Sequence, residues 1–486
     1  MRLAFLRGLT LLRLILTLLG IVDIIMAIPL IAALLTGDLP MIRAFLLPIG
    51  CSLPLILICF LSLRKKELHL SARDGFLLVF AVWALAGILG ALPFYFSPCG
   101  ISFTDAVFES ACAFATTGAT TLADVEALPR SLLLWRSLAH WFGGMGIVLL
   151  TVALFPLLGI GGFQLVKAEA PGPEKEKITP KITVTAKLLW LTYCAFTLIL
   201  FALYRLGGMG WFDALCHSFT TMASGGVSTR NGGIAVFDSP FIEGVSAIFM
   251  LLTAINFNLY YRLLRGKFRD IAANTELRVY LGIFLAALTV LTLSLIPVYG
   301  SPLSALRRAA YQAASFLSTT GSAITDYEQW PALARMVLFI LMFIGGCSGS
   351  TAGGLKVIRH AVLWKQMGNE LRRLIHPRGV FSIQLNKRVG RKDVIYGVAG
   401  FFCLYLLVVA ATTLITAASG TDVFSAFSAA LSITGNIGVG FGAVGPSHNY
   451  GAFPDHIKWL FSFVMIAGRL ELWTVFLLFC PLYWRR

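Results

Sequence analysis

The segment that decides the fold is residues 103–120, FTDAVFESACAFATTGAT, because a related pattern recurs three more times along the chain. The other copies are WFDALCHSFTTMASGGVS at 211–228, SALRRAAYQAASFLSTTGSA at 304–323 and TDVFSAFSAALSITGNIGVG at 421–440. When the four are aligned on Gly118, Gly226, Gly321 and Gly438, an alanine stands twelve positions earlier every time, and a Ser or Ala stands eight positions earlier. Offsets shared by four segments indicate an internal repeat.

The four segments are too short to cross a bilayer and too apolar to be ordinary loops. Backbone that turns back inside a membrane has to be buried in protein or line a watery cavity, so we interpret each segment as a re-entrant half-helix. A half-helix that enters from outside directs its partially negative C-terminal end toward the bilayer centre, which favours a dehydrated cation there. The glycine that follows permits a positive φ, so that carbonyl oxygens face a common axis. The repeats therefore predict a cation pore.

The rest of the sequence is that of a polytopic membrane protein. Of the 486 residues, 58% are hydrophobic and only 13% are charged, with a mean hydropathy of +0.82, which excludes a soluble globular protein. Apolar stretches long enough to span occur near 12–35, 43–63, 75–98, 132–160, 186–206, 240–261, 277–298, 333–364, 394–416 and 457–482, where 333–364 holds a break. Each half-helix lies between two long spans, after one leading pair.

The predicted fold class is therefore all-α integral membrane. Four pseudo-symmetric repeats of span, re-entrant pore helix and span surround one pore, and two extra transmembrane helices precede them. The predicted divisions are 1–66 for the leading pair and 67–170, 171–270, 271–376 and 377–486 for the four pore repeats. The first apolar stretch has no small-residue cleavage site behind a short apolar core, so we expect an uncleaved first span.

The net charge of +16 indicates how the chain is oriented in the membrane rather than nucleic-acid binding, because the basic residues cluster between spans. By the positive-inside rule, the loops 167–187, 262–278 and 356–392 and both termini are cytoplasmic, and we expect no nucleic-acid partner. These loops are also expected to form a docking face for a soluble partner. The opposite loops carry acids that would concentrate cations at the outer mouth: Asp105, Glu109, Asp124, Glu126, Asp213, Asp238, Asp326, Glu328, Asp422 and Asp455.

A broken span is predicted near residues 345–354, because five glycines in ten residues each cost about 1 kcal/mol of helix stability relative to alanine. We expect this segment to lie below the half-helices as a movable gate. Arg469 stands well inside the last apolar stretch, where a charge costs at least about 2.5–3.5 kcal/mol unless it is paired or hydrated. The predicted gate residues are Gly345, Gly346, Ser348, Gly349, Ser350, Thr351, Gly353, Gly354 and Arg469.

The four segments occur together with HWFGGMG at 140–146, PGPEKEKITP at 171–180, GGCSGSTAGGLKVIR at 345–359 and GRLELWTVFLLF at 468–479. In this combination the chain resembles the bacterial Trk/Ktr potassium-transporter superfamily, and within it the Trk-type membrane subunits, from the first span to the C-terminal arginines. The resemblance implies a homodimer in the inner membrane, with one pore in each protomer and contact with membrane lipid. It also implies a cytoplasmic, nucleotide-binding regulatory ring of the Trk A type, with K⁺ as the transported ion and no covalently bound cofactor.

Carried over residue by residue, the resemblance places the selectivity filter at Thr117 and Gly118, Gly225 and Gly226, Thr320 and Gly321, and Ile437 and Gly438. In the family, glycine at the central position of all four repeats accompanies potassium preference, and Gly118 meets that pattern here. No TVGYG-like run is present, and the third and fourth repeats have no hydroxyl two positions after the glycine. We therefore expect fewer strong ion sites than in a symmetric tetrameric channel.

Two other function classes, an enzyme and a coupled carrier, fit the sequence less well. The seven histidines show no HExxH spacing, and Gly354 is followed by Leu355 rather than by the GK[ST] of a P-loop, so an enzyme is not expected. We interpret His140, which opens an apolar span, as an interfacial anchor. A proton- or sodium-coupled potassium carrier remains the alternative, although such carriers usually have inverted repeats and these repeats share one direction.

Overall fold

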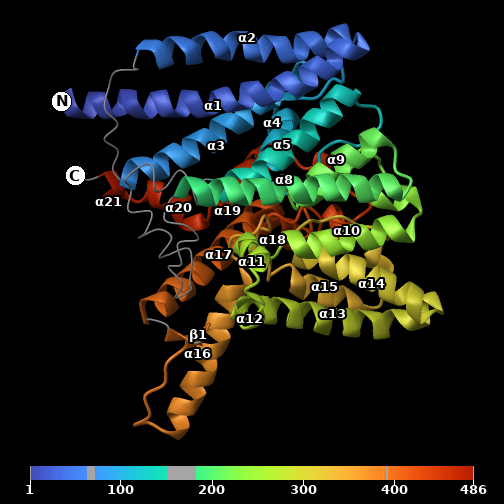
Figure 1. The fold of residues 1–486 in the computed structure, drawn as a ribbon, viewed down its shortest axis with the longest axis vertical. Coiled ribbons are helices and arrows are strands. Elements are labelled where there is room, and N and C mark those ends of the chain that lie inside the picture. Colours follow the sequence, from blue (N-terminus) through green and yellow to red (C-terminus); the bar gives the residue numbers. More distant parts are fainter. Residues whose placement is uncertain (1, 63–71, 150–181, 387, 390–391, 485–486) are drawn as a thin grey trace.

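The computed structural model describes residues 2–62, 72–149, 182–386, 388–389 and 392–484. Within them the chain is helical, apart from an antiparallel pairing of β1 (Gln384–Leu385) with β2 (Arg388–Val389). The long helices form one bundle, and the two ends of the described chain lie at the same end of it (Figure 1). The predicted all-α membrane fold is confirmed.

Two leading helices, α1 (Arg2–Thr36) and α2 (Leu39–Ser62), pack side by side at the edge of the bundle (Figure 1). Both are apolar along most of their length, as a span needs to be. The buried carboxylate of Asp23 accepts a hydrogen bond of 2.8 Å from the hydroxyl of Ser52, which joins the two helices. No pore helix lies between these two helices in the chain, as the repeat pattern predicts.

Four helical units follow, and in each a long helix is followed by a pore helix of 12 to 16 residues and then by a second helix that returns. The long first helices are α3 (Ala72–Tyr95), α8 (Ile182–Leu206), α13 (Thr275–Tyr299) and α17 (Lys392–Ala418). The pore helices are α4 (Phe103–Phe114), α9 (Trp211–Met222), α14 (Pro302–Leu317) and α18 (Val423–Gly435). The returning helices are α5 (Arg130–Leu149), α10 (Pro240–Thr253), α15 (Ala332–Leu341) and α19 (Asp455–Arg469).

The divisions predicted after residues 66 and 170 fall outside the described residues, as do most of the basic loop 167–187 and the motif at 171–180. The division predicted after residue 270 falls inside the short helix α12 (Phe268–Ala272). The divisions as a set remain predictions.

Small residues let the pore helices approach their neighbours closely. The alanines shared by the four repeats, Ala106, Ala214, Ala309 and Ala426, are all fully buried. In α5, a Cβ on Gly143 would overlap the backbone of Phe114, and one on Gly144 would lie 2.8 Å from the Cα of Ala223. The GG pair of the motif at 140–146 therefore seats α5 against the ends of two pore helices.

Three returning helices are bent or broken, where the sequence predicted one break. Helix α10 meets α11 (Phe257–Leu264) at 94°, and α19 meets α20 (Leu472–Phe476) at 114°. The sequence analysis predicted neither of these bends, which fall in the apolar stretches 240–261 and 457–482. Within the described residues, six helices are long and apolar enough to cross a membrane alone, and the two bent pairs bring the number to eight.

The third returning helix breaks between α15 and α16 (Val357–Ile375), as the glycine-rich sequence predicted. Beyond the break, α16 and the β1 and β2 strands form an arm that projects from the bundle (Figure 1). Large apolar side chains stand exposed along this arm, among them Trp364, Leu374 and Ile375.

Candidate functional site

All four pore helices end in the same backbone cap. In each, a backbone amide just beyond the helix donates to the carbonyl oxygen five positions earlier: Thr117 to Cys112 at 3.0 Å, Gly225 to Thr220 at 2.8 Å, Thr320 to Ser315 at 2.9 Å and Ile437 to Ser432 at 2.9 Å. The residue before each donor, namely Thr116, Ser224, Thr319 and Asn436, is left-handed, with φ between 49° and 56°. This is the Schellman pattern, and it turns the chain sharply away from each helix at an equivalent position.

The four anchor glycines follow these caps, and all have positive φ, with values of 84° at Gly118, 58° at Gly226, 72° at Gly321 and 91° at Gly438. A side chain at any of them would be strained, because left-handed backbone brings the Cβ atom against the following carbonyl oxygen. The backbone conformation expected from the sequence is therefore present in all four repeats.

The glycines also lie against one another in a closed ring. A Cβ on Gly118 would lie 2.5 Å from the carbonyl oxygen of Gly225, and one on Gly226 would overlap the carbonyl oxygen of Thr320. A Cβ on Gly321 would overlap the carbonyl oxygen of Ile437, and one on Gly438 would overlap that of Thr117. Each repeat thus touches the next, and the fourth touches the first. The eight residues predicted as the filter are thus brought together in one ring, and each pair follows directly after the C-terminal cap of a pore helix, the partially negative end of its dipole.

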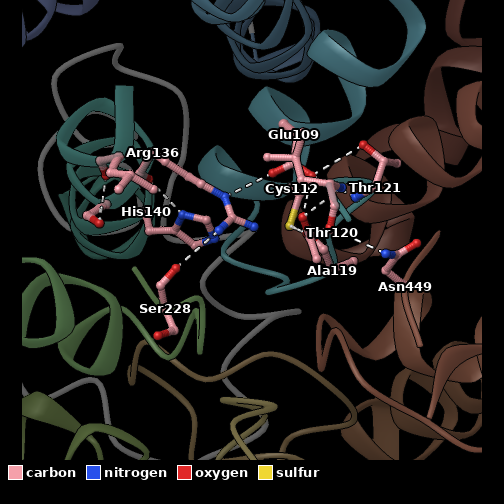
Figure 2. A network of polar contacts seen from close by, with 12 residues as sticks. Glu109, Cys112, Ala119, Thr120, Thr121, Arg136, His140, Ser228 and Asn449 are labelled. Carbon is pink, nitrogen blue, oxygen red and sulfur yellow. Dashed lines mark hydrogen bonds and ion pairs between the residues drawn. The ribbon is translucent and has the colours of Figure 1, made fainter. Parts of the chain in front are cut away.

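Behind the ring, the residue nine positions before the glycine supports the segment that follows it in the first two repeats. In the first repeat this residue is Glu109, whose Oε1 accepts hydrogen bonds of 2.7 Å from the hydroxyl of Thr120 and from the amide of Thr121 (Figure 2). In the second repeat it is His217, whose Nε2 lies 2.9 Å from the hydroxyl of Ser228.

The third and fourth repeats use different side chains for the same purpose. In the third, the hydroxyl of Ser315 donates to the carbonyl oxygen of Ser322 at 2.6 Å. In the fourth, the hydroxyl of Tyr327 donates to the carbonyl oxygen of Gly440 at 2.6 Å, and the amide of Phe441 donates to Ser428 at 2.7 Å. The pseudo-symmetry of the ring is therefore a property of the backbone, while its support is specific to each repeat.

The segment between α15 and α16 folds beneath the ring, and its residues Cys347, Ser350, Thr351 and Ala352 are buried. The hydroxyl of Thr351 lies 3.0 Å from that of Ser224, and the amide of Gly353 donates to the hydroxyl of Thr319 at 2.7 Å. A Cβ on Gly353 would lie 2.5 Å from the carbonyl oxygen of Gly435, next to Asn436. The segment therefore touches the left-handed cap residues of the second and third repeats and reaches that of the fourth.

The same segment is held from outside by the bends of neighbouring spans. At the α10 to α11 bend, the carbonyl oxygen of Ala254 accepts from the amide of Cys347 at 2.8 Å. The carboxylate of Glu276, at the start of α13, accepts from the amide of Ser348 at 2.7 Å. The predicted gate residues 345–354 thus form one connected loop that is largely buried, although Gly349 is exposed.

Arg469 is the last residue of α19, at the bend, rather than well inside a continuous span as predicted. Its Nη1 donates to the carbonyl oxygen of Thr351 at 2.6 Å, while its buried Nε and Nη2 have no hydrogen-bond partner within the described residues. Glu471, two residues on, pairs instead with Arg359 at 2.6 Å. The structure therefore joins Arg469 to Thr351, one of the residues predicted to form the gate.

Two interpretations of single residues were wrong. Glu109 is 1% exposed and pairs with Arg136, so it does not belong to an acidic outer face. Asp124 does lie in an exposed loop, where a hydrogen bond from the side chain of Asn231 lowers its pKa. His140 is fully buried against Gly225 and is no interfacial anchor, because α5 passes directly behind the ring.

Sequence reasoning missed Arg136 as a residue of this site. A signal was present, since Arg136 and His140 are four residues apart on an otherwise apolar helix and therefore share a face of it. Ionisable residues inside a span generally face the bundle interior and find a partner there.

Comparison with known proteins agrees with the arrangement described above. A family model for TrkH, described as a cation transport protein, matches residues 55–485. The chain belongs to the TrkH family. The resemblance drawn from the sequence motifs is thereby confirmed, and because TrkH proteins are transporters, so is the expectation that the chain is not an enzyme.

Relatives in the TrkH family cover nearly the whole chain. The Trk system potassium uptake protein TrkH of Salmonella typhimurium is 42% identical over 427 residues, covering 87% of this chain and 88% of the relative. The protein of the same name from Halomonas elongata is 38% identical and covers 98% of this chain and 100% of the relative. The crystal structure of the potassium transporter TrkH from Vibrio parahaemolyticus matches with a TM-score of 0.88 at 36% identity, covering 99% of this chain and 100% of that one.

Proposed function

We propose that this chain takes up potassium ions across the bacterial inner membrane through a gated pore. The observation that carries the proposal is the closed ring of four positive-φ glycines, each set against the carbonyl group of the next repeat. Rings of backbone carbonyl oxygens replace the hydration shell of a potassium ion. Relatives that share 38–42% of their residues with this chain are named potassium uptake proteins, which supports potassium as the ion.

The filter consists of Thr117 and Gly118, Gly225 and Gly226, Thr320 and Gly321, and Ile437 and Gly438. The four helix C-termini directed at the ring supply partial negative charge without a carboxylate. A dehydrated monovalent cation is stabilised by such dipoles and is still released, because none of them carries a full charge.

The loop 345–354 and Arg469 form the gate below this filter. In the structure the loop touches cap residues of three repeats, so the path beneath the ring is obstructed by protein. The guanidinium of Arg469 holds the loop at Thr351, and its positive charge opposes a cation that leaves the filter on this side. Both effects favour a closed state.

Regulation comes from the cytoplasmic side. Both ends of the described chain lie at one end of the bundle, and the basic residues of 262–278 and 356–392 make that end the cytoplasmic one by the positive-inside rule. A Trk A-type nucleotide-binding ring docks on this face.

A second copy of the chain covers the exposed apolar side chains of the α16 arm, which gives a homodimer with one pore in each protomer.

The test is ion flux through the purified chain in proteoliposomes, with and without a membrane potential. We expect rubidium uptake driven by the potential alone, and we expect Gly118→Ser to raise sodium permeability relative to potassium by displacing the carbonyl of Gly225. An unchanged permeability ratio in a folded Gly118→Ser protein would exclude these glycines as the filter. Saturation at carrier-like turnover with obligatory proton or sodium cotransport would replace the pore with the coupled carrier.

A further inference from the structure

A buried ion pair lies directly behind the first filter segment. Nε of Arg136, from α5, is 2.9 Å from Oε2 of Glu109, from α4, and the two side chains are 3% and 1% exposed (Figure 2). Together they are electrically neutral, so they provide little net attraction for a cation in the pore. Their influence on an ion therefore has to act through the groups that they hold in place.

Glu109 divides its two oxygens between the arginine and the filter segment. Oε2 receives the guanidinium, while Oε1 accepts from the Thr120 hydroxyl and the Thr121 amide at 2.7 Å and from the Thr121 hydroxyl at 3.3 Å. These donors come directly after Gly118 and Ala119. One carboxylate thus fixes where the first segment leaves the ring, and hydrogen bonds to a charged acceptor are roughly twice as strong as neutral ones.

The arginine continues the network into the second repeat. Its Nη1 lies 3.5 Å from the carbonyl oxygen of Ser228. Nδ1 of His217 faces the carbonyl oxygen of Asp213 at 2.7 Å and therefore carries the proton, so Nε2 accepts from the Ser228 hydroxyl at 2.9 Å. Thr120, Glu109, Arg136, Ser228 and His217 form a single hydrogen-bonded chain across two adjacent quarters of the filter.

Among the residues that the structure describes, no such ion pair lies behind the other two quarters. At the position of Glu109, the third repeat has Gln312 and the fourth has Ala429, so neither carries a charge there. A buried ion pair is a poor source of net stability, because desolvation offsets most of the attraction, and an apolar pair of similar volume often serves as well. The presence of the pair behind these two segments alone therefore points to a role in setting their geometry.

We propose that Glu109 and Arg136 are positioning residues for ion selection, which hold the filter segments of the first and second repeats at a fixed spacing. The inference rests on the proposed function, since it presumes that these segments select the ion. A spacing set by charged hydrogen bonds resists the contraction that would be needed to coordinate the smaller sodium ion.

The test compares sodium-to-potassium permeability ratios for single and double variants in proteoliposomes. Arg136→Met leaves a buried, unpaired carboxylate, and Glu109→Gln turns an amide NH₂ toward the guanidinium. Each single variant should raise the ratio about tenfold, equivalent to about 1.4 kcal/mol. The double variant Glu109→Gln/Arg136→Met has no unpaired charge and retains an amide oxygen for Thr120 and Thr121. Because it lacks the guanidinium that reaches Ser228, we expect its ratio to stay about tenfold above that of the unmodified protein, equivalent to about 1.4 kcal/mol.

Glu243→Gln is the matched control, because it removes an ion pair with Arg307 (3.1 Å) that lies outside this network. It should leave the permeability ratio unchanged. Thermal melting in detergent identifies any variant that fails to fold. The double variant then carries the test, because it has no unpaired buried charge and still lacks the bridge between the two segments.

Permeability ratios that are unchanged in folded single variants, or that return to the unmodified value in the double variant, overturn the positioning role. If Gly118→Ser alters selectivity while these variants do not, the filter assignment stands and only the present inference fails. If Gly118→Ser also has no effect, the failure lies in the proposed filter.

Discussion

Two buried, non-helical regions meet at the centre of this molecule, and they are held in opposite ways. Each filter segment begins with a hydrogen bond back to its own pore helix, as Thr117 does to Cys112 at 3.0 Å. The loop 345–354 takes its hydrogen bonds from three different repeats, through Ala254, Thr319 and Arg469 among others. The first arrangement is local and the second is long-range.

The difference shows how one membrane protein combines a rigid element with a movable one. A local cap is rebuilt whenever its helix forms, so the filter geometry persists through shifts of neighbouring helices. Long-range hydrogen bonds depend on the relative placement of whole spans, and a small displacement of α19 or of the α10 to α11 bend breaks several of them together. Packed elements tend to switch between discrete arrangements rather than deform continuously.

The largest effect is expected from a side chain in the rigid element. Gly321→Ala places a Cβ against the carbonyl oxygen of Ile437 at a φ of 72°, and we expect potassium uptake to fall by about 100-fold, equivalent to about 2.7 kcal/mol. Rubidium uptake by cells that lack other potassium systems measures it. Gly266→Ala is the control, because Gly266 has a φ of 71° and open space around its Cβ position. Equal losses in both variants would show that backbone strain, and not the ring, is responsible.

A smaller effect of opposite sign is expected from the movable element. Arg469→Ala removes the donor to Thr351, and deleting part of 348–353 removes the obstruction. Each change should raise potassium flux about fivefold, equivalent to about 1 kcal/mol. Each should also weaken the dependence of the flux on the regulatory partner. The permeability ratio should stay constant, because the caps of the filter are local. Arg469→Lys, which keeps the charge, should give an intermediate flux. Unaltered or reduced flux in well-folded variants of both kinds would contradict the gate assignment.

The smallest effect on the pore is expected from the arm that follows the loop. Reversing the exposed charges of Arg372, Arg373 and Arg378 to glutamate should reduce co-purification of the soluble partner about tenfold, since binding between charged surfaces depends on complementary sign. Flux without the partner and ion selectivity should not change. Replacing the same three residues with lysine keeps the charge and should preserve binding. Undiminished binding by the glutamate variant would leave membrane topology as the only role of these arginines.

Much of this comparison was predictable from the sequence, for a physical reason. The pore helices and the ring depend on glycines at fixed offsets, because only glycine accepts the required backbone at low cost, and such a requirement leaves a visible pattern. The break at 345–354 was predictable in the same way from its five glycines. Both are consequences of local backbone preference.

The bends and the buried pair were not predictable by the same means. The α19 to α20 bend passes through Glu471 at a φ of 67°, so a glutamate takes the left-handed conformation and the nearby Gly468 does not. The bend is held by the ion pair between Glu471 and Arg359, more than a hundred residues earlier. Glu109 and Arg136 stand on different helices, so their contact follows from tertiary packing. A single sequence carries no direct record of such contacts.

The contact between Gly438 and Thr117 closes the ring between the last repeat and the first. These residues are about 320 positions apart, so at a synthesis rate of about 5–20 residues per second the first quarter of the ring waits roughly 15–60 s for the fourth. During that interval the backbone of the first segment has no neighbour on one side, in surroundings that penalise unpaired carbonyl groups. Biogenesis of this protein therefore includes a stage in which a nearly complete chain still lacks a finished pore, and a chain truncated before the last repeat remains permanently at that stage.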